Sequence, residues 1–184
     1  MYNVIENIKK FKPSCEQEIK DRNIIIHQIV KKKEKILYRN CELYHITSSG
    51  FVINQARNKF LIVHHNIYNT WSWMGGHADG EKDLQSVALR EVKEESGIVH
   101  IWPDSENIIS IDILTTSSHI RKGEYVSAHL HFNISYLFVV DEKDSLFVKE
   151  DENSAVIWVN VSDIDQYITD SEMKHVFKKV KGYL

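Results

Sequence analysis

The sequence has little cysteine, proline or glycine, with two, two and seven residues of these types among 184. Cys15 and Cys41 are too few for the disulfide framework of a small secreted domain, and their spacing fits no metal-ligand motif. The low glycine and proline content, with 42% hydrophobic and 27% charged residues, excludes a disordered or fibrous chain. We therefore expect a globular protein whose thiols are reduced.

Long apolar runs and an excess of positive charge are also missing. The longest purely apolar run, residues 136–140, is far below the roughly 20 residues that cross a bilayer, and the first fifteen residues lack an apolar signal core. The formal net charge is −3 and no long Lys/Arg block occurs, which leaves no electrostatic footprint for a membrane or for polymeric nucleic acid. We expect a cytoplasmic protein whose anionic ligand, if it has one, is small.

The chain length allows one domain and an extension, since one domain usually needs only about 100 to 150 residues. Residues 1–42 are rich in Lys, Glu and Ile, and Ile19, Ile26 and Val30 recur at helical spacing. Pro13 interrupts this pattern. We predict an N-terminal helical extension over residues 1–42, in one or two helices, followed by the main domain over residues 43–184.

The main domain alternates between strand and helix patterns. Asp83 is a helix N-cap candidate and Gly97 a helix stop, which predicts a helix over residues 83–96. Two further helices are predicted near the C-terminus, over residues 161–168 and 171–180. Short β-branched runs predict strands over residues 48–54, 59–64, 109–116, 125–140 and 155–160. The fold class is therefore α/β or α+β with a mixed sheet.

Three glutamates share one face of the helix predicted over residues 83–96. At about 100° per residue, Glu91, Glu94 and Glu95 are related as i, i+3 and i+4, and Leu84 and Val87 project in nearly the same direction as Glu91. A solvated acidic face is the usual reading of such a run, but here the acids continue an apolar stripe. Inward carboxylates need partners or a cation, and hard divalent cations such as Mg²⁺ or Mn²⁺ prefer oxygen ligands. The helix is thus a candidate metal site.

Glycines precede this helix in the stretch from Gly75 to Gly80. Glycine lets the backbone turn and approach a ligand closely, and it can present a carbonyl oxygen to a metal or an amide to an anion. We therefore expect a loop here that, with the helix, holds a metal-bound pyrophosphate.

At these residues the chain resembles the Nudix family, whose signature is G-x5-E-x7-R-E-U-x-E-E-x-G-U with U an aliphatic residue. Eight of the nine specified positions match, and they are Gly76, Arg90, Glu91, Val92, Glu94, Glu95, Gly97 and Ile98. The resemblance implies an α/β/α sandwich with a mixed central sheet. It also implies hydrolysis of a nucleoside diphosphate linked to another moiety.

The departure from the signature is its first glutamate. Lys82 holds that position, and Glu81 lies one residue earlier. In the family this glutamate is described as supporting the loop and helix rather than as the main metal ligand. Glu81 therefore either substitutes through a small shift of the turn, or the site is weakened or inactive.

The resemblance implies roles for the matching residues. Glu94, Glu95 and the carbonyl of Gly76 are expected to hold Mg²⁺ or Mn²⁺. Glu91 is expected to be a further ligand or the base that accepts the proton of the attacking water, and Arg90 to orient these acids.

Several further residues are weaker candidates. Glu152, in an acidic loop far along the chain, could add a metal ligand, although an exposed acidic turn is the more common reading. Gly75, Gly76 and His77 could contact the substrate. His129 and His131 lie two apart in a predicted strand and share a face, so they could contact phosphate or carry protons, or form an ordinary half-buried pair.

Two alternatives to hydrolysis stay open at this stage. A Nudix-like module could sense a nucleotide without cleaving it, with the N-terminal helices as a partner-binding or dimerising arm, so that a homodimer is one expected arrangement. Isomerase chemistry on a prenyl diphosphate would need a reactive cysteine near the site, and Cys41 has no supporting motif.

Overall fold

The computed structural model describes residues 1–121 and 123–184 of the chain. It begins with helices α1 (Tyr2–Lys10) and α2 (Glu16–Lys32), followed by the 3-10 helix η1 (Lys33–Leu37). Pro13 lies between α1 and α2, so the break predicted there is confirmed.

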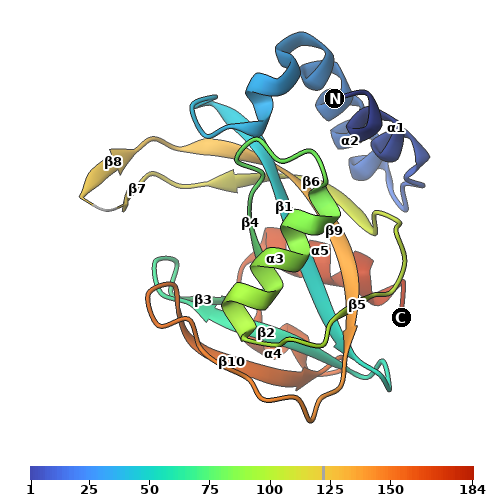
Figure 1. Cartoon of the computed structure of the whole chain (residues 1–184), viewed down its shortest axis with the longest axis vertical. Helices are drawn as coiled ribbons and strands as arrows, with labels where there is room; N and C mark the ends of the chain where they lie inside the picture. Colours follow the sequence, from blue (N-terminus) through green and yellow to red (C-terminus); the bar gives the residue numbers. More distant parts are fainter. Residues whose placement is uncertain (122) are drawn as a thin grey trace.

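A mixed sheet forms the centre of the molecule (Figure 1). In it β1 and β9 run parallel over eleven residue pairs, from Tyr44↔Leu130 to Asn54↔Val140, and the other strand pairs are antiparallel. Strands β7 (His119–Arg121) and β8 (Glu124–Val126) form a separate hairpin that projects from the sheet. The strands of the central sheet are β1 (Tyr44–Asn54), β2 (Lys59–His65), β3 (Thr70–Ser72), β4 (Met74–His77), β5 (Trp102–Pro103), β6 (Ser110–Thr116), β9 (His129–Val140) and β10 (Asn153–Asn160).

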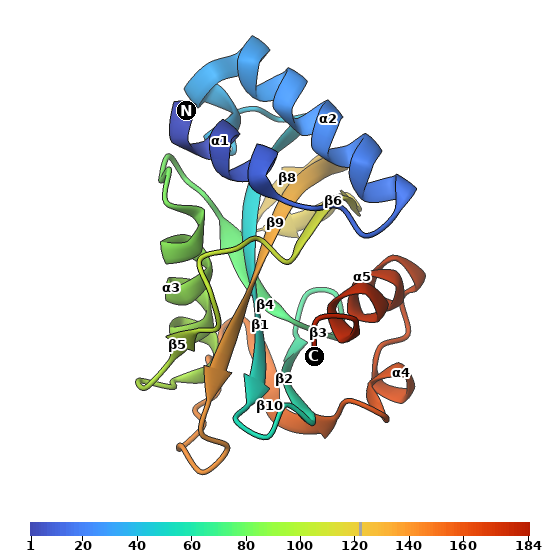
Figure 2. The same cartoon turned by 90° about the vertical axis from the view of Figure 1, so that its right-hand side faces the viewer.

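Helices cover both faces of the sheet (Figure 2). Helix α3 (Leu84–Ser96) lies on one face, and α4 (Ile164–Tyr167) and α5 (Ser171–Lys181) lie on the other. Along β1 the buried side chains alternate between the two cores, because successive residues of a strand point to opposite faces: Val52 joins the core under α3, whereas Phe51 and Ile53 pack with α5. The predicted α/β/α sandwich with a mixed sheet is confirmed.

The N-terminal helices share the core of the sheet that follows them. Ile8 of α1 and Ile25 and Ile29 of α2 are fully or almost fully buried in the same cluster as Ile46 of β1. Figures 1 and 2 show α1 and α2 packed across one end of the sheet. The boundary at residue 42 stays a prediction, and the burial shows that the segment before it is part of one continuous core.

The glycine stretch differs from its prediction. Residues 75–77 were expected in a loop, and that prediction was wrong, because Gly75 and Gly76 belong to β4 and pair with Ser49 and Ser48 of β1. A Cβ at Gly75 would lie 2.6 Å from the Oγ of Ser49, so only glycine lets the two strands come this close. A strand built of glycine carries no β-branched or period-two signal. The turn itself follows at Gly80, where φ is +96°.

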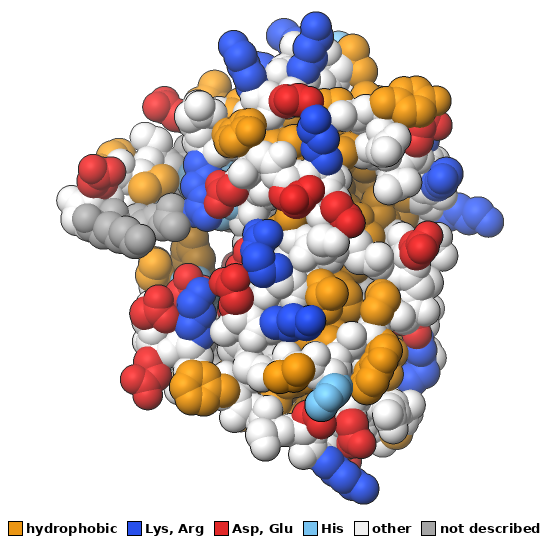
Figure 3. Space-filling view, in the orientation of Figure 1, with side chains coloured by type: hydrophobic (Ala, Val, Ile, Leu, Met, Phe, Trp, Pro, Cys, Tyr) orange, Lys and Arg blue, Asp and Glu red, His pale blue; other side chains and the backbone are white. Residues whose placement is uncertain are grey.

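The surface over α3 mixes both signs of charge. In Figure 3, Lys and Arg side chains are interspersed with Asp and Glu side chains on this face. Among the described residues, none of the helices is long and apolar enough to span a membrane.

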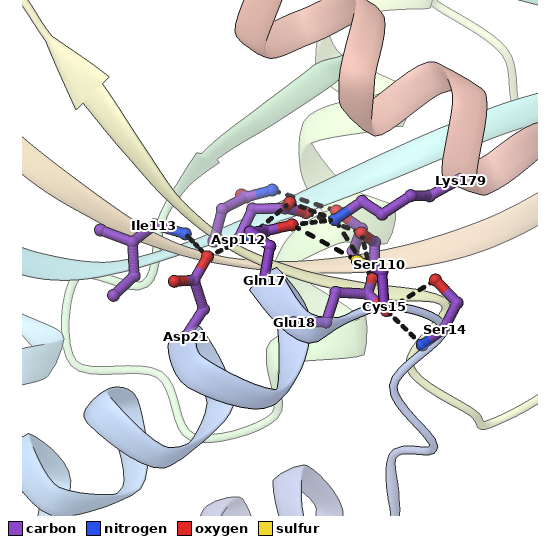
Figure 4. Close-up of polar contacts among 11 residues, drawn as sticks. Ser14, Cys15, Gln17, Glu18, Asp21, Ser110, Asp112, Ile113 and Lys179 are labelled. Carbon is purple, nitrogen blue, oxygen red and sulfur yellow. Dashed lines mark hydrogen bonds and ion pairs between the residues drawn. The ribbon is translucent and has the colours of Figure 1, made fainter.

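A buried group of charges joins the two ends of the chain (Figure 4). The Lys179 ammonium of α5 lies 3.2 Å from an oxygen of Glu18 of α2 and pairs with Asp112 of β6. Ser14 donates two hydrogen bonds to Glu18, from its amide and its hydroxyl, and the Ser110 hydroxyl lies within hydrogen-bond distance of both Glu18 and Asp112. Lys179, Glu18 and Asp112 are all buried. Because each charge is paired and hydrogen-bonded, α2, β6 and α5 hold a fixed arrangement.

Replacement of Lys179 by Met should destabilise the protein by about 3 to 5 kcal/mol, because it leaves two buried carboxylates without their cation. Lys181→Met is the matched control on the same helix. The pair of Lys181 with Asp165 is more exposed, so its loss should cost at most about 1 kcal/mol. Urea unfolding of both variants measures the difference, and equal costs would contradict a structural role for the buried cluster.

The contribution of ionised Glu18 to stability should appear in the pH dependence of the free energy of unfolding. Burial opposes its ionisation, but the hydrogen bonds from Ser14 and the Lys179 ammonium outweigh it and lower the pKa of Glu18 below 4.5. The stabilisation by ionised Glu18 is therefore present above pH 4.5 and lost as the pH falls through the folded-state value. Wild type should exceed Glu18→Gln in free energy of unfolding at neutral pH, and the gap should close in acid. Glu16→Gln, in an exposed pair with Lys20, is the control and should change the free energy of unfolding at neutral pH by at most about 1 kcal/mol.

Candidate functional site

Helix α3 is fixed at both ends by its own sequence. The Asp83 side chain caps its start by accepting from the amide of Ser86 at 3.1 Å, and Gly97 ends it in the left-handed conformation at φ +71°. Both predicted boundaries are confirmed. Val87 and Val92 are fully buried against the sheet, which sets the rotation of the helix and hence the direction of its glutamates.

Glu95 is the buried carboxylate of the site, with 4% of its surface exposed. One of its oxygens accepts a hydrogen bond from the amide of Gly75 at 2.9 Å, and the other accepts from the side-chain amide of Asn153 at 3.0 Å. Burial raises the pKa of Glu95 to about 7, against these two hydrogen bonds. The carboxylate thus ties α3 to β4 and to the start of β10.

Glu91 lies one turn earlier and contacts the next residue of β4. A Cβ built at Gly76 would lie 2.4 Å from the carboxyl carbon of Glu91, so the absence of a side chain there lets the carboxylate lie against the strand. Burial raises the pKa of Glu91, although Arg90 pairs with it at 3.1 Å. Glu91 and Glu95 therefore face consecutive residues of one strand.

Glu94 is more exposed and shares a cation with Glu152. The Lys149 ammonium lies 3.4 Å from a Glu94 oxygen and 3.2 Å from a Glu152 oxygen, and Arg90 lies 3.9 Å from Glu94. The structure thus places Glu152 close to Glu94, next to the same ammonium. Its role as a metal ligand stays a prediction. Lys149 was not predicted, because nothing in the sequence marks a lysine in a surface loop.

The turn before α3 shows what replaces the missing glutamate of the signature. Glu81 accepts hydrogen bonds from the amides of Lys82 and Asp83 at 2.7 and 3.0 Å, which lower its pKa. The Lys82 side chain points to the N-terminal segment and pairs with Glu34. Glu81 is exposed and supports the turn. It does not join the carboxylate group.

The N-terminal segment supports the same turn at two further points. Arg39 forms a two-pronged ion pair with Asp79, with nitrogen–oxygen distances of 2.8 to 3.2 Å. The amide of Gly80 donates to the carbonyl of Leu37 at 3.1 Å. Residues from η1 onward therefore hold the loop that leads into α3.

The histidines named in the sequence analysis form a cluster with a fourth. His45, His77, His129 and His131 each offer a ligand atom, and these atoms lie within 4.8 Å of one another. His45 was not predicted from the sequence, because only the parallel register of β1 with β9 places it opposite His131.

The carboxylate group has the character of a site for a hard divalent cation. Glu91 and Glu95 are half-buried and buried, and Glu94 and Glu152 share the single Lys149 ammonium. Oxygen donors in this number suit Mg²⁺ or Mn²⁺, and a cation would offset the desolvation of Glu91 and Glu95. These residues fit such an ion. Arg90 supplies the remaining positive charge beside Glu91 and Glu94.

Known proteins share this fold and sequence pattern. A model of the NUDIX domain matches residues 43–180. The chain is 26% identical over 137 residues to the RNA pyrophosphohydrolase of Pelagibacter ubique (strain HTCC1062), covering 72% of this chain and 86% of that protein. It is similar in structure to the E. coli dihydroneopterin triphosphate pyrophosphohydrolase, with a TM-score of 0.57, 13% identity, and 76% and 96% of the two chains covered. The C. elegans Ap4A hydrolase gives a TM-score of 0.53, 18% identity, and coverage of 75% and 96%.

Replacement of Gly76 by Ala should weaken Mg²⁺ binding by about 10- to 100-fold, because the added Cβ displaces the Glu91 carboxylate from the strand. Isothermal titration with Mg²⁺ measures the effect. Unfolding of the same variant in urea must show a folded protein for the comparison to hold. Unchanged Mg²⁺ affinity in a folded variant would contradict a role for the contact between Gly76 and Glu91.

Proposed function

Since the chain belongs to the Nudix family of pyrophosphohydrolases, we propose that it hydrolyses the pyrophosphate bond of a nucleoside diphosphate linked to another moiety, with Mg²⁺ or Mn²⁺. The observation that carries this proposal is the convergence of Glu91 and Glu95 on Gly76 and Gly75. Buried acids of like charge on one helix face cost stability, and a cation-dependent reaction gives them a use.

We assign Glu94, Glu95, Glu152 and the Gly76 carbonyl as the residues that would hold the metal. When bound, a divalent cation neutralises phosphoryl oxygens and lowers the pKa of water near neutral pH. Within the described residues each Glu95 oxygen accepts one hydrogen bond, so both keep a free lone pair. Glu94 and Glu152 both pair with the Lys149 ammonium, which marks a place already suited to positive charge.

The remaining residues of the site orient these acids and handle the proton. Glu91 would be a further ligand or the base for the attacking water, and its raised pKa keeps it closer to neutral pH than an exposed glutamate. Arg90 contacts both Glu91 and Glu94 and orients them. The backbone of Gly75 and Gly76 would approach the diphosphate, because no side chain covers it.

The substrate class follows from the bond that the site would cleave. The Pelagibacter relative is named an RNA pyrophosphohydrolase, which supports a pyrophosphate bond as the target. The mixed charge of the face in Figure 3 offers no continuous basic surface for a polymer, which favours a small nucleotide derivative.

The test measures coupled phosphate release from nucleoside triphosphates, nucleoside diphosphate sugars, dinucleoside polyphosphates and 5′-triphosphorylated RNA, with Mg²⁺ or Mn²⁺. Glu94→Gln and Glu95→Gln should each lower turnover more than about 100-fold, since loss of even an outer partner of a metal site costs about 10- to 100-fold. Glu106→Gln makes the same change at an exposed glutamate outside the site and should leave turnover unchanged.

Glu94→Gln is the cleaner of the two variants. Its side chain is 46% exposed, whereas a Gln at position 95 would turn an amide toward the donors of Gly75 or Asn153 and reduce stability. Turnover that survives Glu94→Gln would overturn the assigned role. Tight nucleotide binding without turnover would instead support a sensing module, and turnover confined to RNA would overturn the small-substrate assignment.

A further inference from the structure

Four histidines gather at one end of the sheet, on the face opposite α3. His45 is the second residue of β1, His77 is the last residue of β4, and His129 and His131 lie at the start of β9. Their ring centroids lie 4.8 to 5.2 Å apart in the contacts of His45 with the other three and of His77 with His131. Three strands thus contribute to one cluster.

The hydrogen bonds of two rings fix which nitrogen faces inward. The Nδ1 atoms of His45 and His129 contact the carbonyl oxygens of Cys41 and Ser127 at 3.2 and 2.8 Å. A carbonyl oxygen only accepts, so these Nδ1 atoms carry the proton, and in the neutral rings the Nε2 atoms carry lone pairs. Histidines that bind a metal are oriented in the same way, because the ring nitrogen that does not face the metal donates a hydrogen bond to the protein.

Among the residues that the structure describes, the inward nitrogen of one ring has no hydrogen-bond partner, and that of another meets a second imidazole nitrogen. Nε2 of His45 is buried without a hydrogen-bond partner within the described residues. Nε2 of His129 faces Nε2 of His131 at 3.0 Å, so two lone pairs would oppose one another unless a proton or a cation lies between them. A proton on His131 would satisfy that pair alone. It would leave Nε2 of His45 unsatisfied.

The geometry points to a Zn²⁺ site formed by His45, His77, His129 and His131. Imidazole is a preferred ligand of Zn²⁺, and four protein ligands are typical of a closed, structural zinc site. With zinc–nitrogen distances of about 2.0 to 2.1 Å, ligand atoms in a tetrahedron lie about 3.4 Å apart. Separations near the 4.8 Å limit would need to shorten by about 1.4 Å, and the 3.0 Å between the Nε2 atoms of His129 and His131 would need to widen by about 0.4 Å.

The surroundings suit a cation that is bound by neutral rings. Burial lowers the pKa of both His45 and His131, the latter to about 3, so these rings are neutral at physiological pH. A pocket of about 320 Å³ lined by His129, Thr116 and Leu43 gives access to the edge of the cluster. The ion would link the end of β4 to β1 and β9, next to Gly76.

This site is separate from the carboxylate group and is tested without turnover. The purified 184-residue chain, freed of metal by a chelator, should bind one Zn²⁺ per chain in the presence of excess Mg²⁺. Its Co²⁺ form should show the strong visible absorption of tetrahedral nitrogen coordination. His45→Gln and His131→Gln should each weaken Zn²⁺ affinity more than about 100-fold, beyond the cost of losing an outer partner.

Two controls separate the outcomes. His175→Gln changes an exposed histidine outside the cluster, and Glu94→Gln changes the carboxylate group, and both should leave Zn²⁺ affinity unchanged. Absence of Zn²⁺ binding by the wild-type chain would overturn the proposal. So would binding that survives both cluster variants or is lost in Glu94→Gln. The Co²⁺ spectrum of the wild-type chain keeps the test valid if a cluster variant fails to fold.

Discussion

The site depends on one buried carboxylate. Glu95 accepts a hydrogen bond from the amide of Gly75 with one oxygen and from the side chain of Asn153 with the other, so α3, the preceding strand β4 and the distant strand β10 meet at it. Its desolvation is a cost that the surrounding packing has to offset, and Val87 and Val92 on the same helix supply that packing. The apolar stripe of α3 fixes the rotation of the helix, and through Glu95 that rotation fixes where β4 and β10 approach it.

The N-terminal segment has a structural part in this arrangement. The signature of the family has a glutamate at the position of Lys82. Here Lys82 pairs with Glu34 of the N-terminal segment, and Glu81 accepts hydrogen bonds from the backbone amides of its own turn. Arg39 holds Asp79 of the same turn. Glu18 of α2 pairs in turn with Lys179 of α5. The N-terminal segment that contacts the turn before α3 is therefore itself held by the C-terminal helix.

The sequence predicted the elements whose signals are local. Asp83 and Gly97 mark the ends of α3, and the 3.6-residue period of its apolar residues gives the face of the glutamates, so helix and acids are both readable without a structure. Strand β4 was missed because glycine has no strand signal, and Lys149 and His45 were missed because their positions depend on long-range register. The residues of a motif can be recognised from a short stretch of sequence. Which strands lie side by side depends on residues far apart in the chain, so it cannot be read in the same way.

Strand β4 contributes residues to both the carboxylate site and the histidine cluster. Successive residues of a strand point to opposite faces, and here Gly76 faces Glu91 of α3 while His77 contacts His45 and His131 on the other side. A shift of this short strand would therefore move the backbone of the carboxylate site and the histidine cluster together. Pairing of residues 74–77 with β1 resists such a shift, and a link between His77 and β9 would resist it further. The histidines would thus stabilise the carboxylate site by fixing the strand beneath it, without any need to touch the substrate.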